Sequence, residues 1–181
     1  MTGASGAPIA ARVLVALSAA GAPFDLVVSA GGRAVWEEEN GPTLADFERR
    51  AAHVYSDGDL AAPVASGTVA TSGMAIVPCS MSQLARVATG LSDTLISRAA
   101  HVHLKEHRRL VLVPRETPLD AISLAHMTRL AELGVTMLVA SPPYYLHPKS
   151  VEDQTDYLAG KVLDHLGVSH SLYRPWGGRA P

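Results

Sequence analysis

The chain has 181 residues, of which 48% are hydrophobic and 18% are charged; it is long enough for one ordinary domain and too apolar to be disordered. Its 15 basic and 17 acidic residues give a formal charge of -2, which argues against a nucleic-acid or membrane-surface partner. Cys79 is the one cysteine, so no disulfide can form within the chain, and no basic residue precedes the first apolar stretch as in a signal peptide. We therefore expect a cytoplasmic protein.

The predicted elements alternate along the chain. In chain order, the hydrophobic pattern predicts a helix over 7–21, a strand over 24–30, a short helix in the irregular segment 41–68, a strand over 74–80, helices over 81–90 and 92–108, a strand over 109–115, a helix over 119–134, a strand over 135–141 and a helix over 150–167. The strands are continuously apolar, as in a sheet covered on both faces. We predict a single α/β domain over 1–181, a doubly wound parallel sheet in a Rossmann-like or flavodoxin-like three-layer sandwich.

The chain begins at a glycine-rich turn that this fold places after its first strand. Residues 1–7 read "MTGASGA", and almost no strand precedes them. The first strand is therefore expected to be truncated at the N-terminus: either it is very short, or the true start lies upstream of Met1.

Ligands of open α/β sheets bind at the carboxyl ends of the strands, so the residues there are candidates for a site. Small residues at the first turn let backbone N–H groups approach an anion, although a tight turn into the helix is an equal alternative: Gly3, Ala4, Ser5 and Gly6. Serine hydroxyls beside free N–H groups at two further helix starts suit a phosphate or a flavin edge, with an ordinary helix cap as the alternative. The candidates are Ser29 and, at the second start, Ser80, Met81, Ser82 and Gln83.

Two opposite charges, Arg115 and Glu116, follow the strand that ends near Val113. Neighbouring side chains of an extended segment point to opposite sides, so the two groups need not neutralise each other. A guanidinium can bind an anionic group, and a carboxylate can accept a proton or face a developing cation; a surface ion pair is the alternative. The next strand leads to the tyrosines of "SPPYYLHP" (141–148), and Lys161 lies on the helix that follows.

Other reactive residue types favour structural roles. His101, His103 and His107 diverge around a helix, so we predict no metal site. No histidine is placed beside Cys79 by the sequence, which favours a buried, inert thiol. Trp36 and Trp176 are expected to pack.

A set of motifs, in this order, is far more specific than its members. They are "TGASGA" (2–7), "PCSM" (78–81), "ATG" (88–90), "RAAHVHLKEHRRLVLVPRETPL" (98–119), "YYLHPKSVED" (144–153) and "RPWG" (174–177). Over essentially the whole chain, this set resembles the UbiX-type flavin prenyltransferases.

The resemblance implies an enzyme that binds reduced FMN and dimethylallyl phosphate, without a metal. Such enzymes join the prenyl group to flavin N5 and close a ring through C6. Their product, prenylated FMN, is the cofactor of UbiD-type decarboxylases. The resemblance also implies a large homo-oligomer, a dodecamer, with sites at subunit interfaces.

The same resemblance assigns roles to residues of this sequence. FMN would be bound by Gly3, Ala4, Ser5, Ser29, Ser80, Met81, Ser82, Gln83 and Arg115. The prenyl phosphate would be held by Arg98, Lys105, Tyr145 and Lys161, of which Arg98 and Lys105 could act across an interface. Catalysis would involve Ser5, Glu39, Lys105 and Glu116. Arg115 would thus serve the flavin, and Glu116 the leaving phosphate and proton movements.

The sequence departs from the family pattern at two places. His101 stands where the family usually has Asp, and Ser82-Gln83 where Gly-Thr often follows Cys-Ser-Met. Two alternatives remain: a non-catalytic FMN-binding paralogue, and a flavin-dependent cysteine decarboxylase of the same fold. The chain lacks a "PASANT"-like stretch and its first histidine is His53, which argues against the cysteine decarboxylase.

Overall fold

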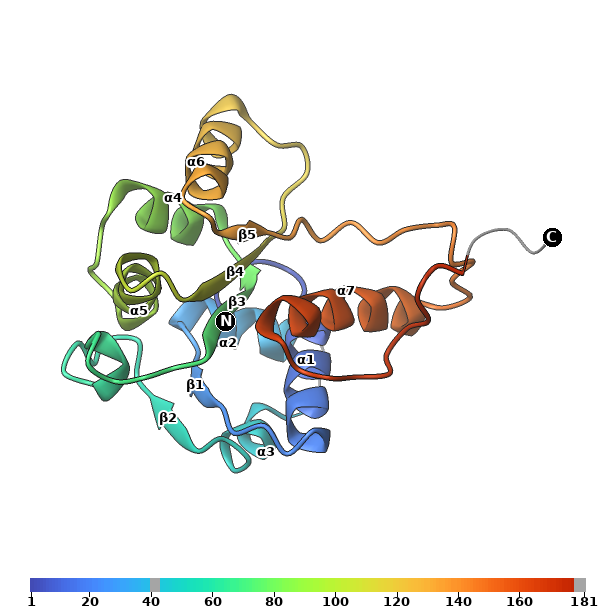
Figure 1. Ribbon diagram of the computed structural model, residues 1–181, viewed down its shortest axis with the longest axis horizontal. Coiled ribbons are helices and arrows are strands. Elements are labelled where there is room, and N and C mark those ends of the chain that lie inside the picture. The colour runs from blue at the N-terminus through green and yellow to red at the C-terminus, as the bar shows by residue number, and fades with distance from the viewer. Residues whose placement is uncertain (40–42, 178–181) are drawn as a thin grey trace.

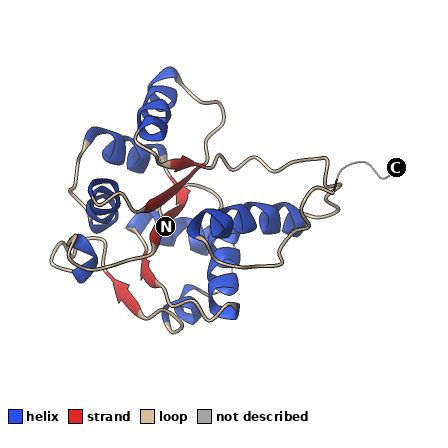
Figure 2. Ribbon diagram, viewed as in Figure 1, coloured by secondary structure: helices blue, strands red, loops and turns tan. Residues whose placement is uncertain are grey.

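The computed structural model of the protein describes residues 1–39 and 43–177 (Figures 1 and 2). In chain order the elements are α1 (Ala7–Ala19), β1 (Asp25–Val27), α2 (Ala30–Glu38), α3 (Leu44–Glu48), β2 (His53–Tyr55), the 3-10 helix η1 (Pro63–Ala65), β3 (Gly73–Cys79), α4 (Met81–Thr89), α5 (Leu95–Lys105), β4 (Arg109–Pro114), α6 (Ala121–Glu132), β5 (Thr136–Met137) and α7 (Val151–Leu166). Asn40, at the end of the acidic run 36–40, and the start of the 41–68 segment lie outside the described residues.

All strand pairs are parallel, in two groups: β1 with β2, and β3–β4–β5 in that order. The first two residues of the chain lie between the groups. The Met1 amino group donates to the Val27 carbonyl (2.9 Å), and the Met1 carbonyl accepts from Ser29 N–H (3.1 Å). On the other side, Thr2 N–H donates to the Pro78 carbonyl (3.2 Å). Residues 1–2 thus join the two groups at their carboxyl edge.

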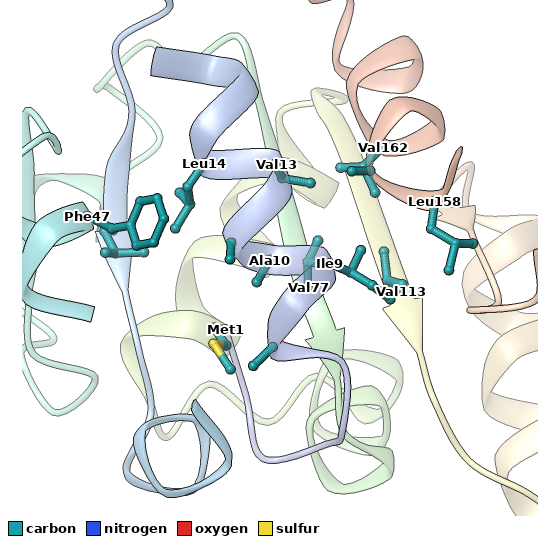
Figure 3. Close-up of a cluster of buried hydrophobic side chains, with 14 of the residues drawn as sticks. Met1, Ile9, Ala10, Val13, Leu14, Phe47, Val77, Val113, Leu158 and Val162 are labelled. Atoms are coloured by element: carbon teal, nitrogen blue, oxygen red, sulfur yellow. The ribbon is translucent and has the colours of Figure 1, made fainter. Parts of the chain in front are cut away.

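Helices cover both faces of the sheet, and side chains along β4 alternate between two cores. Val111 and Val113 pack with α1 and α7, where buried residues include Ile9, Val13, Leu158 and Val162 (Figure 3). Leu110 and Leu112 pack on the opposite face with residues of α4, α5 and α6. This alternation makes three layers, and the predicted α/β fold class is confirmed.

The boundaries differ from the sequence-based expectation where a polar cap or a sheet edge decides them. The strand expected over 24–30 ends at Val27, because Ser29 caps α2, which begins at Ala30. Thr94 and Ser97 form a capping box, so α5 begins at Leu95 rather than at residue 92. The irregular segment 41–68 contains an unexpected strand, β2, at the sheet edge. The strand expected over 135–141 keeps only Thr136–Met137 as β5.

Thr2 is a buried threonine, 2% exposed, whose side chain fixes the turn after β3. Its hydroxyl donates to the Pro78 carbonyl (2.9 Å) and accepts from Ser80 N–H (2.8 Å). Thr2 therefore ties the glycine-rich turn to the start of α4, and sets how the two loops lie relative to each other.

Replacing Thr2 with Val should lower the free energy of unfolding by about 1–3 kcal/mol, because the Ser80 N–H loses its acceptor at a site with little water. Urea unfolding of the purified protein measures this. Thr2→Ser keeps the hydroxyl and should retain most of the stability; a Val variant as stable as the Ser variant would contradict the role given to this hydroxyl.

Candidate functional site

The carboxyl edge of the sheet brings three predicted site elements to one place: the glycine-rich turn, Glu39 and Arg115. The Glu39 carboxylate accepts from Gly6 N–H (3.0 Å) and Ala7 N–H (2.7 Å), the free backbone donors at the start of α1. The helix dipole favours a negative charge there. Arg115 Nε donates to the Ser5 carbonyl (3.3 Å). The glycine-rich turn that contains Ser5 is thus contacted by a carboxylate, that of Glu39, and by a guanidinium, that of Arg115.

The turn can approach α2 closely because both contact points are glycines. A Cβ on Gly3 would lie 3.2 Å from the Gly31 Cα. A Cβ on Gly32 would lie 2.9 Å from the Met1 carbonyl oxygen. Larger side chains at these positions would push the turn away from the N-terminus of α2, so the close approach depends on the small residues of both segments.

Ser29 and Ser80 are both helix N-caps. The Ser29 hydroxyl accepts from Gly32 N–H (3.1 Å) and the Ser80 hydroxyl from Gln83 N–H (3.3 Å). Both serines are thus the ordinary helix caps that the sequence offered as the alternative to ligand-binding residues. Capping does not exclude a ligand, because an accepting hydroxyl still has a proton that it can donate to a bound oxygen.

Gln83 carries the most direct sign of a ligand. Its side chain lies in the first turn of α4 and is 4% exposed. Within residues 1–39 and 43–177, its amide nitrogen is the one buried side-chain polar atom without a hydrogen-bond partner. A buried donor without a partner costs free energy, whereas a ligand rich in acceptors, such as a flavin with its ring carbonyls and nitrogens, would satisfy it. The residues at this edge therefore fit FMN.

A cavity of ≈ 540 Å³ lies next to Ser29, at the carboxyl ends of β1 and β2. This volume is in the range of small-molecule pockets, about 300–1,000 Å³. Its lining combines apolar and polar side chains from the two strands and from the starts of α2 and α5: Val28, Ala30, Arg33, Val54, Tyr55, Ser56, Asp57, Gly58, Asp93 and Thr94. No motif of the sequence predicted these residues as part of a site.

Arg115 and Glu116 are both exposed and turn to different partners. Arg115 reaches the glycine-rich turn, whereas a Glu116 carboxylate oxygen accepts from the adjacent Thr117 N–H (3.0 Å). The described part of the chain shows no ion pair between the two. The alternative of a mutual surface ion pair is therefore not what the structure contains.

Within one chain, Lys105 does not join this group. It ends α5, which leads back to the start of β4 at Arg109, while Arg115 follows the other end of that strand. Six residues of strand separate the two edges by roughly 20 Å. Lys105 contacts Glu106 instead, and Arg98 donates through Nε to the Ala65 carbonyl (3.0 Å).

Tyr145 lies on the long segment between β5 and α7, and Lys161 lies on α7 itself (Figure 1). The Lys161 ammonium donates to Asp164 Oδ2 (3.0 Å), and this hydrogen bond raises the lysine pKa. The Tyr145 ring meets Trp176 edge to face, with 5.3 Å between centroids. Tyr157, which no sequence motif predicted as a site residue, interacts with both Tyr145 and Lys161. Its spacing of four residues from Lys161 on a helix was the signal that could have identified it.

The remaining reactive residues serve the fold. Burial raises the pKa of the Cys79 thiol to about 12, which makes it a poor nucleophile. His101 Nε2 lies 3.0 Å from the Val87 carbonyl oxygen, and His103 Nδ1 lies 2.8 Å from that of Ala99. In the described ranges there is no group of three or more His, Cys, Asp or Glu residues arranged to hold a metal. Nor does any helix in those ranges have the length and apolar character needed to cross a membrane.

Comparison with known proteins gives the class of this chain. The family model described as Flavoprotein matches residues 1–164. The flavin prenyltransferase UbiX of Thermoplasma acidophilum is 43% identical over 176 residues, which cover 97% of each chain.

Two solved structures agree. AnUbiX (PadA1), in complex with FMN and dimethylallyl pyrophosphate, has a TM-score of 0.96 at 39% identity and covers 99% of this chain and 96% of its own. The dodecameric FMN-dependent Ubix-like decarboxylase from Escherichia coli O157:H7 has a TM-score of 0.95 at 40% identity, with 98% and 97% covered. The chain therefore belongs to the flavoprotein family and, within it, to the UbiX flavin prenyltransferases.

Replacing Gln83 with Leu should leave the stability of the ligand-free protein unchanged or raise it, because the variant no longer buries an amide donor without a partner. The same change should weaken FMN binding roughly three- to ten-fold, the value of one neutral hydrogen bond. Flavin fluorescence titration and thermal unfolding without FMN measure the two effects. Unchanged FMN affinity would show that the amide does not face the flavin.

Proposed function

We propose that this protein transfers a dimethylallyl group from dimethylallyl phosphate to reduced FMN, at N5 and then C6, and so makes prenylated FMN. One observation carries the proposal: the buried, unpartnered Gln83 amide lies at the same sheet edge as the turn held by Glu39 and Arg115, in a chain that belongs to the UbiX flavin prenyltransferases. A buried hydrogen-bond donor without a partner, and a turn of small residues held by charged side chains, suit a flavin substrate.

We assign FMN to the carboxyl edge. The backbone of Gly3, Ala4 and Ser5 would approach the ring system, and the capping hydroxyls of Ser29 and Ser80 would donate to oxygens of the flavin. The set is completed by Met81, Ser82, Gln83 and Arg115. Support comes from AnUbiX, whose structure contains FMN, and from the fit of the Gln83 donor.

We assign the prenyl phosphate to Tyr145 and Lys161, with Arg98 and Lys105 supplied by a neighbouring copy. Lys105 needs a second copy because its own chain places it at the other edge of the sheet. The dodecameric relative from Escherichia coli O157:H7 supports assembly of this chain into a large homo-oligomer.

The proposed residues match the demands of the chemistry. A phosphate leaves an allylic carbon as an anion, and fixed Lys and Arg donors stabilise that charge in advance. Reduced FMN supplies the nucleophile, which the turn at Ser5 would hold close to the prenyl carbon. Ring closure releases a proton, and the carboxylates of Glu39 and Glu116 are the groups able to accept or return protons here.

The product would pass to a UbiD-type decarboxylase in the cytoplasm. The single cysteine supports the compartment, and the resemblance to enzymes that make this cofactor supports the recipient. A cysteine decarboxylase is not favoured, since relatives that share about 40% of their residues with this chain are flavin prenyltransferases. The second candidate is an FMN-binding paralogue without activity, and a test for prenyl transfer distinguishes it from the prenyltransferase.

Incubation of the protein with reduced FMN and dimethylallyl phosphate under anaerobic conditions should yield a flavin heavier by one five-carbon prenyl unit. Mass spectrometry of the flavin released on denaturation measures this. Tightly bound but unmodified FMN would contradict the prenyltransferase and favour the paralogue without activity.

Glu116→Gln should leave FMN affinity nearly unchanged and lower kcat by about 100-fold or more, as expected when a group that moves a proton is removed. Glu132 is an exposed glutamate on α6, so Glu132→Gln is a matched control that should keep full activity. An unchanged kcat for the Glu116 variant, measured as the rate of prenylated flavin formation, would exclude this residue from the mechanism.

A further inference from the structure

Tyr157 interacts electrostatically with both predicted prenyl-phosphate residues, Tyr145 and Lys161. It is one helical turn before Lys161, so their side chains share a face of α7. Burial is the largest cause that raises the pKa of Tyr157, followed by the nearby ionisable Tyr145 phenol and a hydrogen bond to it. A tyrosine phenol is protonated at neutral pH, so Tyr157 has one O–H that it can donate, to Tyr145 or to a ligand oxygen.

A compact network behind Tyr157 holds this face of α7 in place. The Asp164 carboxylate accepts from the Lys161 ammonium (3.0 Å) and contacts the Tyr173 hydroxyl, and His170 Nε2 lies 3.0 Å from its other oxygen. The Tyr173 ring lies 5.0 Å from that of Tyr157, centroid to centroid. These contacts fix the segment after α7 against the helix.

Gly160 makes this packing possible. A Cβ at this position would lie 2.6 Å from the Tyr173 ring and 2.7 Å from the His170 ring. A glycine inside a helix lowers stability relative to alanine, so the close packing of the two rings against it explains its presence.

Tyr157 also lines a cavity of ≈ 270 Å³, between the loop before α7 and the segment after it. Its wall contains three basic residues, Lys149, Arg174 and His147, against one acidic residue, Asp153. The charges in this wall favour an anion over a cation, and the remaining lining supplies apolar surface from proline and leucine side chains: Pro142, Pro143, Leu146, Pro148 and Leu172.

We propose that Tyr157 is a specificity-determining donor of the prenyl-phosphate subsite: its phenol hydroxyl hydrogen-bonds a phosphate oxygen that Tyr145 and Lys161 also bind. The inference rests on the proposed function and deepens it. Tyr145 lies on a loop and is 51% exposed, whereas Tyr157 is half-buried on a helix. Tyr157 therefore adds to the subsite a donor that is positioned by a helix rather than by a loop.

The test compares Tyr157→Phe with Tyr144→Phe, which removes the hydroxyl of an exposed tyrosine outside this network. Phenylalanine keeps the ring that packs against Tyr173. For each variant, steady-state assays give KM for dimethylallyl phosphate and the inhibition constant of inorganic phosphate, and flavin fluorescence gives the FMN dissociation constant. Both ligands present phosphate, but only the first presents the prenyl group.

We expect Tyr157→Phe to raise KM for dimethylallyl phosphate and the inhibition constant of phosphate by about ten-fold, the value of one hydrogen bond to a charged group, with FMN affinity unchanged. The Tyr144 variant should match the unaltered protein. Unchanged phosphate constants, or an equal rise in both variants, would overturn the proposal. Absence of prenyl transfer by the unaltered protein would instead refute the proposed function, and this inference with it.

Discussion

The hydrogen bonds that residues 1–2 make on both sides determine the geometry of the carboxyl edge. Met1 bonds the end of β1, and Thr2 bonds the end of β3, so the glycine-rich turn that follows begins from a fixed point between the two strand groups. The turn, the N-terminus of α2 and the N-terminus of α4 are consequently held side by side. In a doubly wound sheet this is where the strand order reverses, and the crevice there is the usual ligand site.

Opposite charge then arranges the turn itself. The first N–H groups of α1 are satisfied by Glu39, a residue 32 positions beyond Ala7 in sequence. The Ser5 carbonyl accepts a hydrogen bond from Arg115, the residue that follows β4. One carboxylate and one guanidinium thus hold opposite sides of a turn with no large side chain of its own. Such an arrangement combines a backbone that lies close to a ligand with charges that are fixed in position before the ligand binds.

The sequence predicts the layers of this fold well, because continuous apolar strands and periodic helices leave few other arrangements. It predicts less about β2 and β5: β2 has three residues and β5 has two, too short for a pattern in the sequence to set their bounds. For the site, motifs identify residues but not their partners. Three features of the site depend on tertiary packing, which a pattern along the sequence does not describe. They are the capping of α1 by Glu39, the unpartnered amide of Gln83 and the interaction of Tyr157 with Tyr145 and Lys161.

The direction of α5 makes the proposed site depend on more than one chain. A helix that connects two parallel strands must return from the carboxyl edge to the amino edge, so its last residue cannot reach the ligands of its own sheet. Lys105 is that residue, and its charge is paired with Glu106 in the single chain. If Lys105 stabilises the leaving phosphate, it does so at the site of a neighbouring copy. Assembly would then be a condition for catalysis, since it would bring the charge of one subunit to the flavin of another.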